Sequence, residues 1–279
     1  ITQGYTASVN DGHGGTVSRD VTVIMTGVND RAVITSAAGD HVGAVTEDAA
    51  TPDLVATDTI TFTDVDLIDT HIRSSAFTTS NATADLPGFT DGTSNIGVFT
   101  LGAIAAVNTD TINSASFTWT FTLANGDATL QSLAENQSIT QTYTVSIVDS
   151  SGTGNATRTQ DVTVTINGDN DQAAITSLAG DHVGAVTEDT GAVGGNLIAT
   201  DTIAFSDIDL IDTHTRGFVN TASDSNADLP GFVNNTTYIG TFALGAISED
   251  NTNTDINGSL GWTFTLANGD ATLQSLAEG

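Results

Sequence analysis

The segment FTWTFTLANGDATLQSLAE, from Phe117 to Glu135, carries the clearest structural pattern in the chain. Apolar residues, three of them aromatic, alternate with threonines from Phe117 to Leu123. Successive side chains of a strand point to opposite faces, so this alternation predicts a half-buried β-strand. The following Asn-Gly pair predicts a turn, and Asp127 is a suitable N-cap for one short helix.

Most of this segment is repeated further along the chain. Trp119–Glu135 recurs without change at Trp262–Glu278, a shift of 143 residues (262 minus 119). The motif ITSxAGDHVGAVTED at Ile34–Asp48 recurs at Ile175–Asp189, a shift of 141 residues (175 minus 34). A unit of this length is far longer than a solenoid repeat, so we expect each copy to be a domain in a tandem array.

The two ends of the chain also match internal segments. ITQGYTASVND at Ile1–Asp11 resembles ITQTYTVSIVD at Ile139–Asp149, and TGVND at Thr26–Asp30 resembles INGDND at Ile166–Asp171. We therefore expect residues 1–30 to be the C-terminal hairpin of a preceding or neighbouring unit. Residues 31–171 would form a complete cadherin-like repeat, and residues 172–279 a second repeat that lacks its last two strands.

This division leaves two possibilities for the open second repeat. Most simply, the chain continues past both of its ends. Alternatively, the hairpin of one copy completes the open repeat of the next by strand addition. In either case Trp262, Phe264 and Leu266 are expected to lose their sheet neighbours within residues 172–279.

Composition and turn spacing indicate the fold class. The chain has 29 Asp but only 5 Glu, and Thr, Val, Ile, Ser and Gly dominate the remainder. Asp favours turns whereas Glu favours helices, and β-branched residues favour strands. Several short strands per unit, with turn signals at roughly ten-residue spacing, predict an all-β chain of tandem immunoglobulin/cadherin-like β-sandwich domains with one short helix per unit.

The charge balance excludes several classes of partner and of covalent link. Five Arg and no Lys oppose 34 acidic residues, giving a formal net charge of -29. A nucleic-acid partner or an anionic membrane surface requires basic residues that this chain lacks. No run approaches the roughly 20 apolar residues of a membrane span, so we expect no membrane insertion. The absence of Cys and Lys excludes disulfides and Lys-Asn isopeptide bonds.

The strongest acidic motif is DVDLIDTH at Asp64–His71, which recurs as DIDLIDTH at Asp207–His214. Alternate residues of a strand project to one side, so the first two carboxylates of each motif should lie together. A cation between them would relieve their repulsion, and Ca2+ accepts about 6 to 8 oxygen ligands in flexible geometry. The spacing does not match an EF-hand. The alternative is a solvated Asp-rich turn. The candidate ligands are Asp64, Asp66, Asp69, Asp207, Asp209 and Asp212.

Two further acidic segments accompany each motif. Asn-Asp pairs precede the two units, and a Glu-Asp pair ends the first predicted strand of each. In a sandwich whose linker enters at one pole, these segments and the DxD turn can converge at that pole. Together they would bind one or more Ca2+ ions between domains, although an Asn-Asp pair taken alone is more often a plain turn. The additional candidates are Asn29, Asp30, Glu47, Asp48, Asn170, Asp171, Glu188 and Asp189.

The order of the motifs GAVTED, FTDVDLIDTH, WTFTLANGDATLQSLAE, ITQTYTVSIVD and TVTINGDNDQAAI resembles the VCBS repeat family. These are cadherin-like modules of large secreted bacterial adhesins of the RTX-adhesin type. The resemblance covers essentially the whole chain, although Val33 and Ala174 stand where the family junction has Pro. It implies a secreted or surface-anchored rod with Ca2+ as the usual ligand and a role in adhesion and biofilm.

The sequence favours a structural function over catalysis. The five His residues do not form an HExxH motif, and no GxSxG elbow occurs, so we expect no enzymatic activity. The expected partners are adjacent repeats of the same protein, head to tail, and cell-surface or matrix components. The alternative is a carbohydrate- or receptor-binding module of an adhesin, for which Tyr238 is the main candidate.

Overall fold

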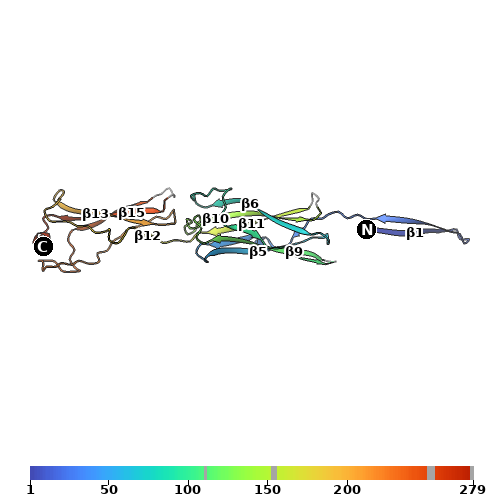
Figure 1. Cartoon of the computed structure of the whole chain (residues 1–279), viewed down its shortest axis with the longest axis horizontal. Helices are drawn as coiled ribbons and strands as arrows, with labels where there is room; N and C mark the ends of the chain where they lie inside the picture. Colours follow the sequence, from blue (N-terminus) through green and yellow to red (C-terminus); the bar gives the residue numbers. More distant parts are fainter. Residues whose placement is uncertain (110–111, 152–155, 250–254, 277–279) are drawn as a thin grey trace.

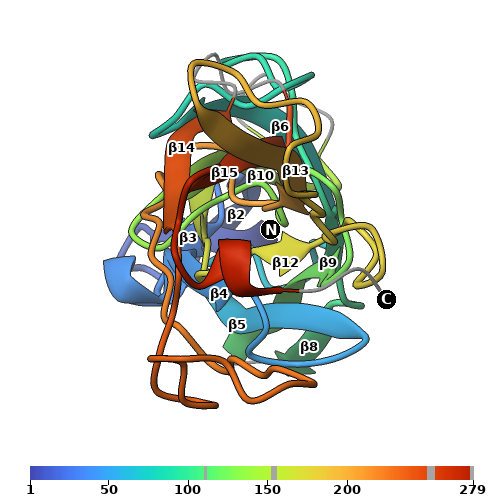
Figure 2. The same ribbon diagram turned by 90° about the vertical axis from the view of Figure 1, so that its left-hand side faces the viewer.

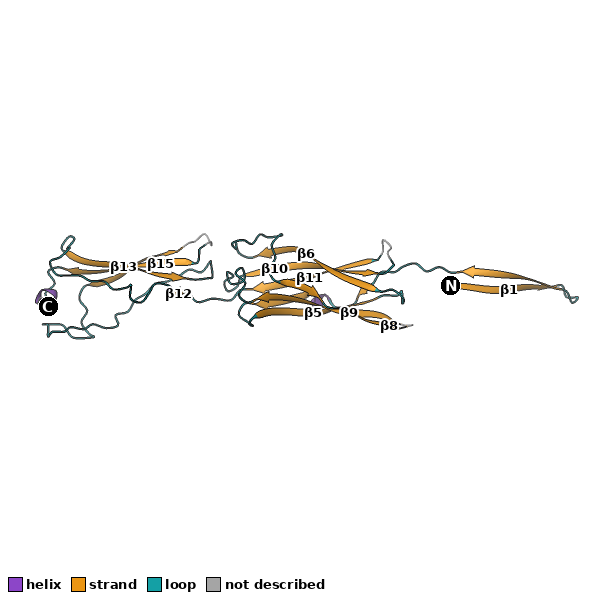
Figure 3. Cartoon of the chain, in the orientation of Figure 1, coloured by secondary structure: helices purple, strands orange, loops and turns teal. Residues whose placement is uncertain are grey.

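The computed structural model describes residues 1–109, 112–151, 156–249 and 255–276. The chain extends along one axis, with the N-terminal hairpin at one end and the last strands at the other (Figure 1). Figure 2 looks along that axis, so the sheets lie behind one another. Strands and loops make up almost all of the chain, as Figure 3 shows. The described part contains no helix long and apolar enough to cross a membrane.

Residues 31–171 form two sheets. The first has the strand order β4-β11-β10-β6, and the second has the order β3-β5-β9-β7, with β8 also paired to β9. Strand β4 runs parallel to β11, and the other pairs are antiparallel. This is the Greek-key order of immunoglobulin- and cadherin-like sandwiches, so the predicted fold class is confirmed. The elements are β3 (Val33–Ile34), η1 (Ala38–His41), β4 (Val42–Thr46), β5 (Asp53–Thr63), β6 (His71–Ala82), β7 (Val98–Leu101), β8 (Ala105–Thr109), β9 (Ile112–Ala124), β10 (Ser138–Asp149) and β11 (Thr157–Asn167).

The core of this unit lies between the two sheets. Every second residue of β10 is buried, as the alternation in the sequence predicts. The ring of Phe99 on β7 is stacked between Trp119 on β9, at 5.8 Å between centroids, and Tyr143 on β10, at 4.3 Å. This aromatic stack joins the two sheets across the core.

Residues 172–276 form one sheet with the strand order β12-β13-β15-β14. Strand β15 therefore keeps both neighbours, contrary to the expectation that Trp262, Phe264 and Leu266 lose theirs. What this unit lacks, among its described residues, is the second sheet. The segments equivalent to β4 and β6, at 183–187 and 214–225, are not continuous strands here. The elements are β12 (Ala174–Ile175), β13 (Asn196–Ser206), β14 (Thr241–Glu249), β15 (Asn257–Ala267) and η2 (Leu273–Ser275).

The N-terminal hairpin consists of β1 (Thr2–Asn10) and β2 (Thr16–Ile24), which among the described residues pair only to each other. Its register places Tyr5 opposite Val21, just as Tyr143 lies opposite Val162 in the β10–β11 pair. All of its strand residues are exposed.

The expected short helix is only a single turn. The carboxylate Oδ1 of Asp127 accepts hydrogen bonds from the backbone N of Thr129 (3.0 Å) and of Leu130 (3.3 Å), which is the predicted capping role. The turn ends because Leu133 N bonds to Leu130 O at 2.9 Å, which is the tighter spacing of a 3-10 turn. The second copy forms the 3-10 helix η2, and its residues 277–278 lie outside the described residues.

Candidate metal centres at the unit junctions

The first DxD turn lies directly after β5 and is fixed by its own hydrogen bonds. The buried Asp64 carboxylate accepts the backbone N–H of Asp66 at 3.0 Å through Oδ1 and contacts His71 Nε2 at 3.0 Å through Oδ2. The His71 ring packs edge-on against Phe62 of β5, at 4.9 Å between centroids. His71, the first residue of β6, is therefore hydrogen-bonded to the turn.

Three carboxylates gather beside this turn. Asp64, Asp69 and Asp149, the last residue of β10, each offer an oxygen within 4.8 Å of the others. Burial and then the charges of Asp149, Asp66 and Asp64 raise the pKa of Asp69. Burial alone would raise the pKa of Asp149, but hydrogen bonds from Ser151 and Asn29 lower it overall. Such a group of oxygens matches the ligand preference of Ca2+.

The linker before the unit is tied to this pole. The backbone N of Asp30 donates to Asp66 Oδ2 at 2.7 Å, and Asn29 Nδ2 donates to Asp149 Oδ2 at 3.3 Å. The Asn-Asp pair and the DxD turn, which are far apart in the sequence, therefore meet as predicted.

The second junction repeats the contacts of the DxD turn and of the Asp backbone, whereas Asn170 Nδ2 donates to the carbonyl oxygen of Asp171 at 2.9 Å. The backbone N of Asp171 donates to Asp209 Oδ2 at 2.7 Å, and the N of Asp209 donates to Asp207 Oδ1 at 3.1 Å. His214 Nε2 lies 3.0 Å from Asp207 Oδ2. Asp207 and Asp209 are buried, whereas Asp212 is partly exposed.

Glu47 joins this second junction from the unit before it. The residue follows β4 and is only 1% exposed. Its Oε2 accepts the backbone N–H of Asp169 at 3.1 Å, and its Oε1 accepts the side-chain amide of Gln131. Burial, together with the charges of Asp171, Asp209 and Asp48, raises the pKa of Glu47 to about 7. Burial and the charges of Asp212, Asp171 and Asp207 likewise raise the pKa of Asp209 to about 6.

The segments therefore converge in a different combination from the one expected. Glu47 meets the DxD turn of the following unit, not that of its own unit. The reason is that β4 runs parallel to β11, and the backbone N of Glu47 donates to Asn167 O at 2.9 Å where β11 leaves the sandwich. The second junction thus takes its Glu from the unit before and its DxD turn from the unit after. Glu188 is partly exposed and has no such junction among the described residues.

Asp48 and Asp189 have a separate, structural environment. The backbone N of Asp48 donates to Asn125 Oδ1 at 2.9 Å, and Asn125 Nδ2 returns a bond to Asp48 Oδ1 at 2.6 Å. Asp189 and Asn268 form the same pair at 2.9 and 2.7 Å. These pairs join the turn after the first strand to the Asn-Gly turn, and their carboxylates are engaged there.

The repeat pattern did not predict one acidic residue that lies beside the second DxD turn. Glu249, at the end of β14, places Oε2 2.6 Å from His214 Nδ1. Burial lowers the pKa of His214, but hydrogen bonds to the carboxylates of Glu249 and Asp207 raise it overall. Glu249 lies opposite Gly258, and the equivalent pair in the first unit is Ala106 opposite Ala115. Because the first unit has Ala at this position, comparing the two copies could not identify Glu249 as a site residue.

Two buried carboxylate oxygens give the clearest test of whether these residues fit a cation. Asp171 Oδ2 and Asp209 Oδ1 are inaccessible to solvent and have no hydrogen-bond partner. Buried anionic oxygens are costly unless they are paired or coordinate a metal. The charges of Asp171 and Asp209 also help to raise the pKa of Glu47, and the charge of Asp171 helps to raise that of Asp209. The residues present therefore fit a hard divalent cation.

Strand order and acidic junctions together define a tandem β-sandwich protein of cadherin-like topology. No protein-family model matches the chain, and neither does any curated protein. Among solved structures, the cadherin-like domains 1 to 4 of zebrafish RET are similar at 11% identity and a TM-score of 0.28, over 96% of this chain and 50% of that one. The chain thus spans half the length of that structure. The class assignment rests on the strand order described above.

Proposed function

We propose that the chain is a calcium-stabilised structural repeat of an extracellular adhesin, in which Ca2+ at each junction fixes one β-sandwich against the next. The observation that carries the proposal is the grouping of the buried Glu47 and Asp209 with the partly exposed Asp171, with one buried, unpartnered oxygen on each of the two Asp residues. These three carboxylates come from one unit, the linker and the next unit. A cation bound there would join all three segments.

The charge of the chain supports a cation-dependent fold. At a formal net charge of -29, self-repulsion opposes the compact state, and bound cations relieve it. Neither a disulfide nor a Lys-Asn isopeptide bond is available to hold the units, because the sequence has no Cys and no Lys. Bound Ca2+ would therefore set both the stability of the fold and the stiffness of the rod.

The cellular setting follows from the resemblance to VCBS modules. The chain would be part of a secreted bacterial rod that holds an adhesive region away from the cell or within a biofilm matrix, without catalytic activity. Its partners would be adjacent repeats, head to tail, and cell-surface or matrix components.

The test is thermal unfolding in Ca2+ and in chelator. Sites with Kd of ~0.1 to 1 mM, in 5 mM Ca2+, would stabilise by about 1 to 2 kcal/mol each, or roughly 3 to 8 °C in Tm. Asp171→Asn should lose most of the calcium-dependent gain at the second junction. Asp228→Asn, at an exposed loop residue, is the matched control and should retain it.

Small-angle X-ray scattering tests the stiffness separately. The largest dimension of the particle should be greater and better defined in Ca2+ than in chelator. Equal Tm and equal dimensions in the two conditions would contradict the proposal.

A further inference from the structure

We infer that the open face of residues 172–276 is a docking surface for the β1–β2 hairpin of a second copy of this chain. The complete unit shows what belongs on that face. There the β10–β11 hairpin covers the equivalent residues, and β1–β2 has the sequence pattern and the strand register of that hairpin.

The hairpin presents one apolar face without cover. Tyr5 is 54% exposed, whereas its equivalent Tyr143 is 4% exposed in the complete unit. A two-stranded hairpin alone in water is at best marginally stable, so this face requires a partner. The exposed apolar residues that correspond to buried ones in β10–β11 are Ile1, Tyr5, Val9, Val21, Val23 and Met25.

The aromatic stack of the second unit lacks one ring. Phe242 stacks on Trp262 at 5.5 Å, as Phe99 stacks on Trp119, but no tyrosine covers its other side. Instead Phe218, itself 51% exposed, leans edge-on against Phe242 at 5.0 Å. An open groove of about 560 Å³ lies along these two residues and Phe264. Tyr5 of a second copy would complete the stack there as Tyr143 does at 4.3 Å from Phe99.

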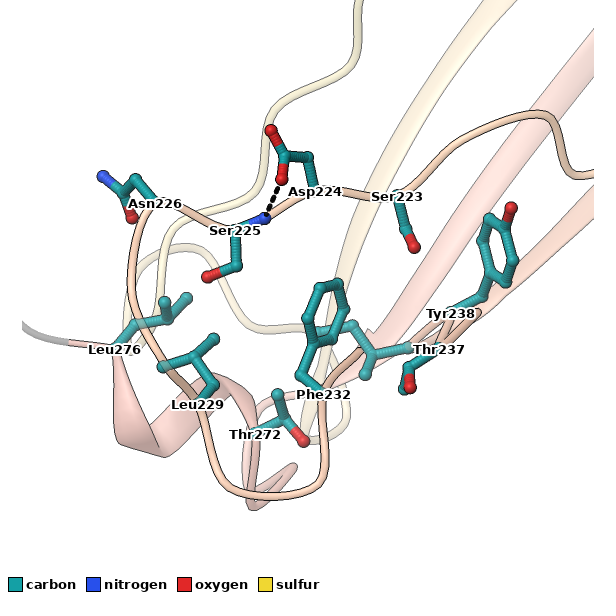
Figure 4. A pocket seen from close by; sticks show the side chains of 11 residues that line it. Ser223, Asp224, Ser225, Asn226, Leu229, Phe232, Thr237, Tyr238, Thr272 and Leu276 are labelled. Carbon is teal, nitrogen blue, oxygen red and sulfur yellow. Dashed lines mark hydrogen bonds between the residues drawn. The ribbon is translucent and has the colours of Figure 1, made fainter. Parts of the chain in front are cut away.

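A second hollow of about 480 Å³ adjoins this groove and shares lining residues with it (Figure 4). Leu229, Phe232 and Leu276 surround it. Their equivalents Leu86, Phe89 and Leu133 pack in one cluster with Ile139 and Ile166. Ile1 and Met25 are the hairpin residues equivalent to that isoleucine pair. They already lie side by side, because Met25 N donates to Ile1 O at 2.7 Å.

The hairpin already forms the Tyr-to-Gln hydrogen bond that its equivalent forms in the complete unit. Gln141, which is fully buried, bonds to the backbone of Ile96 through both ends of its amide, at 3.2 and 3.1 Å, and accepts the hydroxyl of Tyr143 at 3.2 Å. Gln3 already accepts the hydroxyl of Tyr5 at 2.5 Å. On docking, its amide would meet the backbone of Ile239, which lines both hollows.

Asp11 would add the third carboxylate of a cation cluster. It is the hairpin equivalent of Asp149, which completes the group with Asp64 and Asp69. Its Oδ1 accepts the backbone N of His13 at 2.9 Å, as Asp149 Oδ1 accepts that of Ser151 at 2.9 Å. The second unit has Asp207 and Asp212, but its described residues contain no equivalent of Asp149. This calcium part rests on the proposed function, whereas the packing part does not.

Within one copy of residues 1–279 the hairpin cannot reach the open face. The hairpin and the open face lie at opposite ends of the extended chain, with the complete unit between them (Figure 1). Each molecule therefore has a donor end and an acceptor end. Association of this kind is heterologous and produces head-to-tail chains.

Cysteine trapping tests the docking directly, because the chain has no native Cys. In the complete unit the hydroxyls of Thr78 and Thr144 lie 2.7 Å apart, and the corresponding positions are Thr221 and Thr6. Mixing a Thr6→Cys chain with a Thr221→Cys chain should give a disulfide-linked heterodimer at least tenfold faster than mixing Thr22→Cys with Thr221→Cys. Equal rates in the two mixtures would overturn the inference.

Sedimentation of the cysteine-free variants provides the second measurement. Val21→Asp, on the apolar face, should abolish concentration-dependent association, and Thr22→Asp, on the opposite face, should retain it. Wild-type chain that remains a monomer at ~100 µM would overturn the inference.

Repeating both measurements in chelator separates the two proposals. Docking that persists without Ca2+ supports the packing and counts against the part assigned to Asp11. Docking that needs Ca2+, and that Asp11→Asn weakens, supports both.

Discussion

Trp119–Glu135 and Trp262–Glu278 have the same sequence but different surroundings. Leu133 of the first copy is fully buried, whereas Leu276 of the second is 42% exposed. Trp119 is inaccessible, and Trp262 is still only 7% exposed. The tryptophan of the strand is therefore buried in both copies, whereas the leucine of the turn that follows is buried only in the first.

The difference identifies what each layer contributes. Strand β15 pairs with β13 and β14 without help from a second sheet, so the register of this sheet is local to the unit. Burial of the turn and continuous strand structure at β4 and β6 occur only where β10 and β11 are present. The last hairpin of a unit thus organises its second sheet.

Supplying a β10–β11 hairpin to the second unit in the same chain should make the two copies equally buried, and this is the largest effect that we expect. Fusing a copy of Gln137–Asp171 after Gly279 should raise the melting temperature of the second unit by more than ~10 °C, since it buries a whole sheet face. Amide hydrogen exchange at Trp262 and Leu266 should slow in parallel. A fused copy with Val162→Asp is the control. If both fusions behaved like the parent chain, the organising role of the hairpin would be refuted.

Leucine truncation compares the two copies at one matched position. Leu133→Ala removes a fully buried side chain and should cost about 2 to 5 kcal/mol in the free energy of unfolding. Leu276→Ala, at the half-exposed equivalent, should cost less than about 1 kcal/mol. Urea unfolding of the two variants measures both values, and similar losses would show that the turns are equally packed in solution. The Leu276→Ala loss should increase in the fused chain.

Lower pH should stabilise the calcium-free second junction. Burial and neighbouring charges raise the pKa of Glu47 from 4.5 to about 7 and that of Asp209 from 3.8 to about 6 in the folded chain. Raised carboxyl pKa values contribute stability that is fully present below the unfolded values and is lost as pH rises through the folded ones. In chelator, Tm should therefore fall by roughly 5 °C as pH rises from about 4.5 to 7.

The calcium-bound chain provides the control for this pH effect. Ca2+ competes with protons for the same oxygens, so in saturating Ca2+ the fall should vanish or reverse. A chelated chain whose Tm rises with pH over this window would contradict the assignment of Glu47 and Asp209 as buried, mutually repelling carboxylates.

Local patterns in the sequence were sufficient for the strands and for much of the site. The alternation around Trp119 and Tyr143 predicted which faces are buried. The repeated DxD motif predicted an acidic turn after a strand, but not the burial of Asp64, Asp207 and Asp209. The capping Asp127 was predicted correctly, but its helix stops after one turn because Leu133 closes a tighter bond.

Longer-range features could not be read from the sequence. The parallel pairing of β4 with β11 sends Glu47 to the following junction, and no local pattern reports that pairing. Asp48 has the sequence of a ligand but is bound by Asn125, 77 residues away. Glu249 occurs in one copy only, so the repeat gave no signal for it.

The most direct test of the account is the melting temperature of Asp209→Asn in chelator and in Ca2+. Asn retains an acceptor for the backbone N of Asp171 and removes a charge that Glu47 and Asp171 repel. The account predicts opposite signs: Tm at or above wild type by a few degrees in chelator at pH 7.5, and below wild type by a few degrees in 5 mM Ca2+. A Tm lowered equally in both conditions would mean that Asp209 serves packing alone and would contradict a cation at the junction.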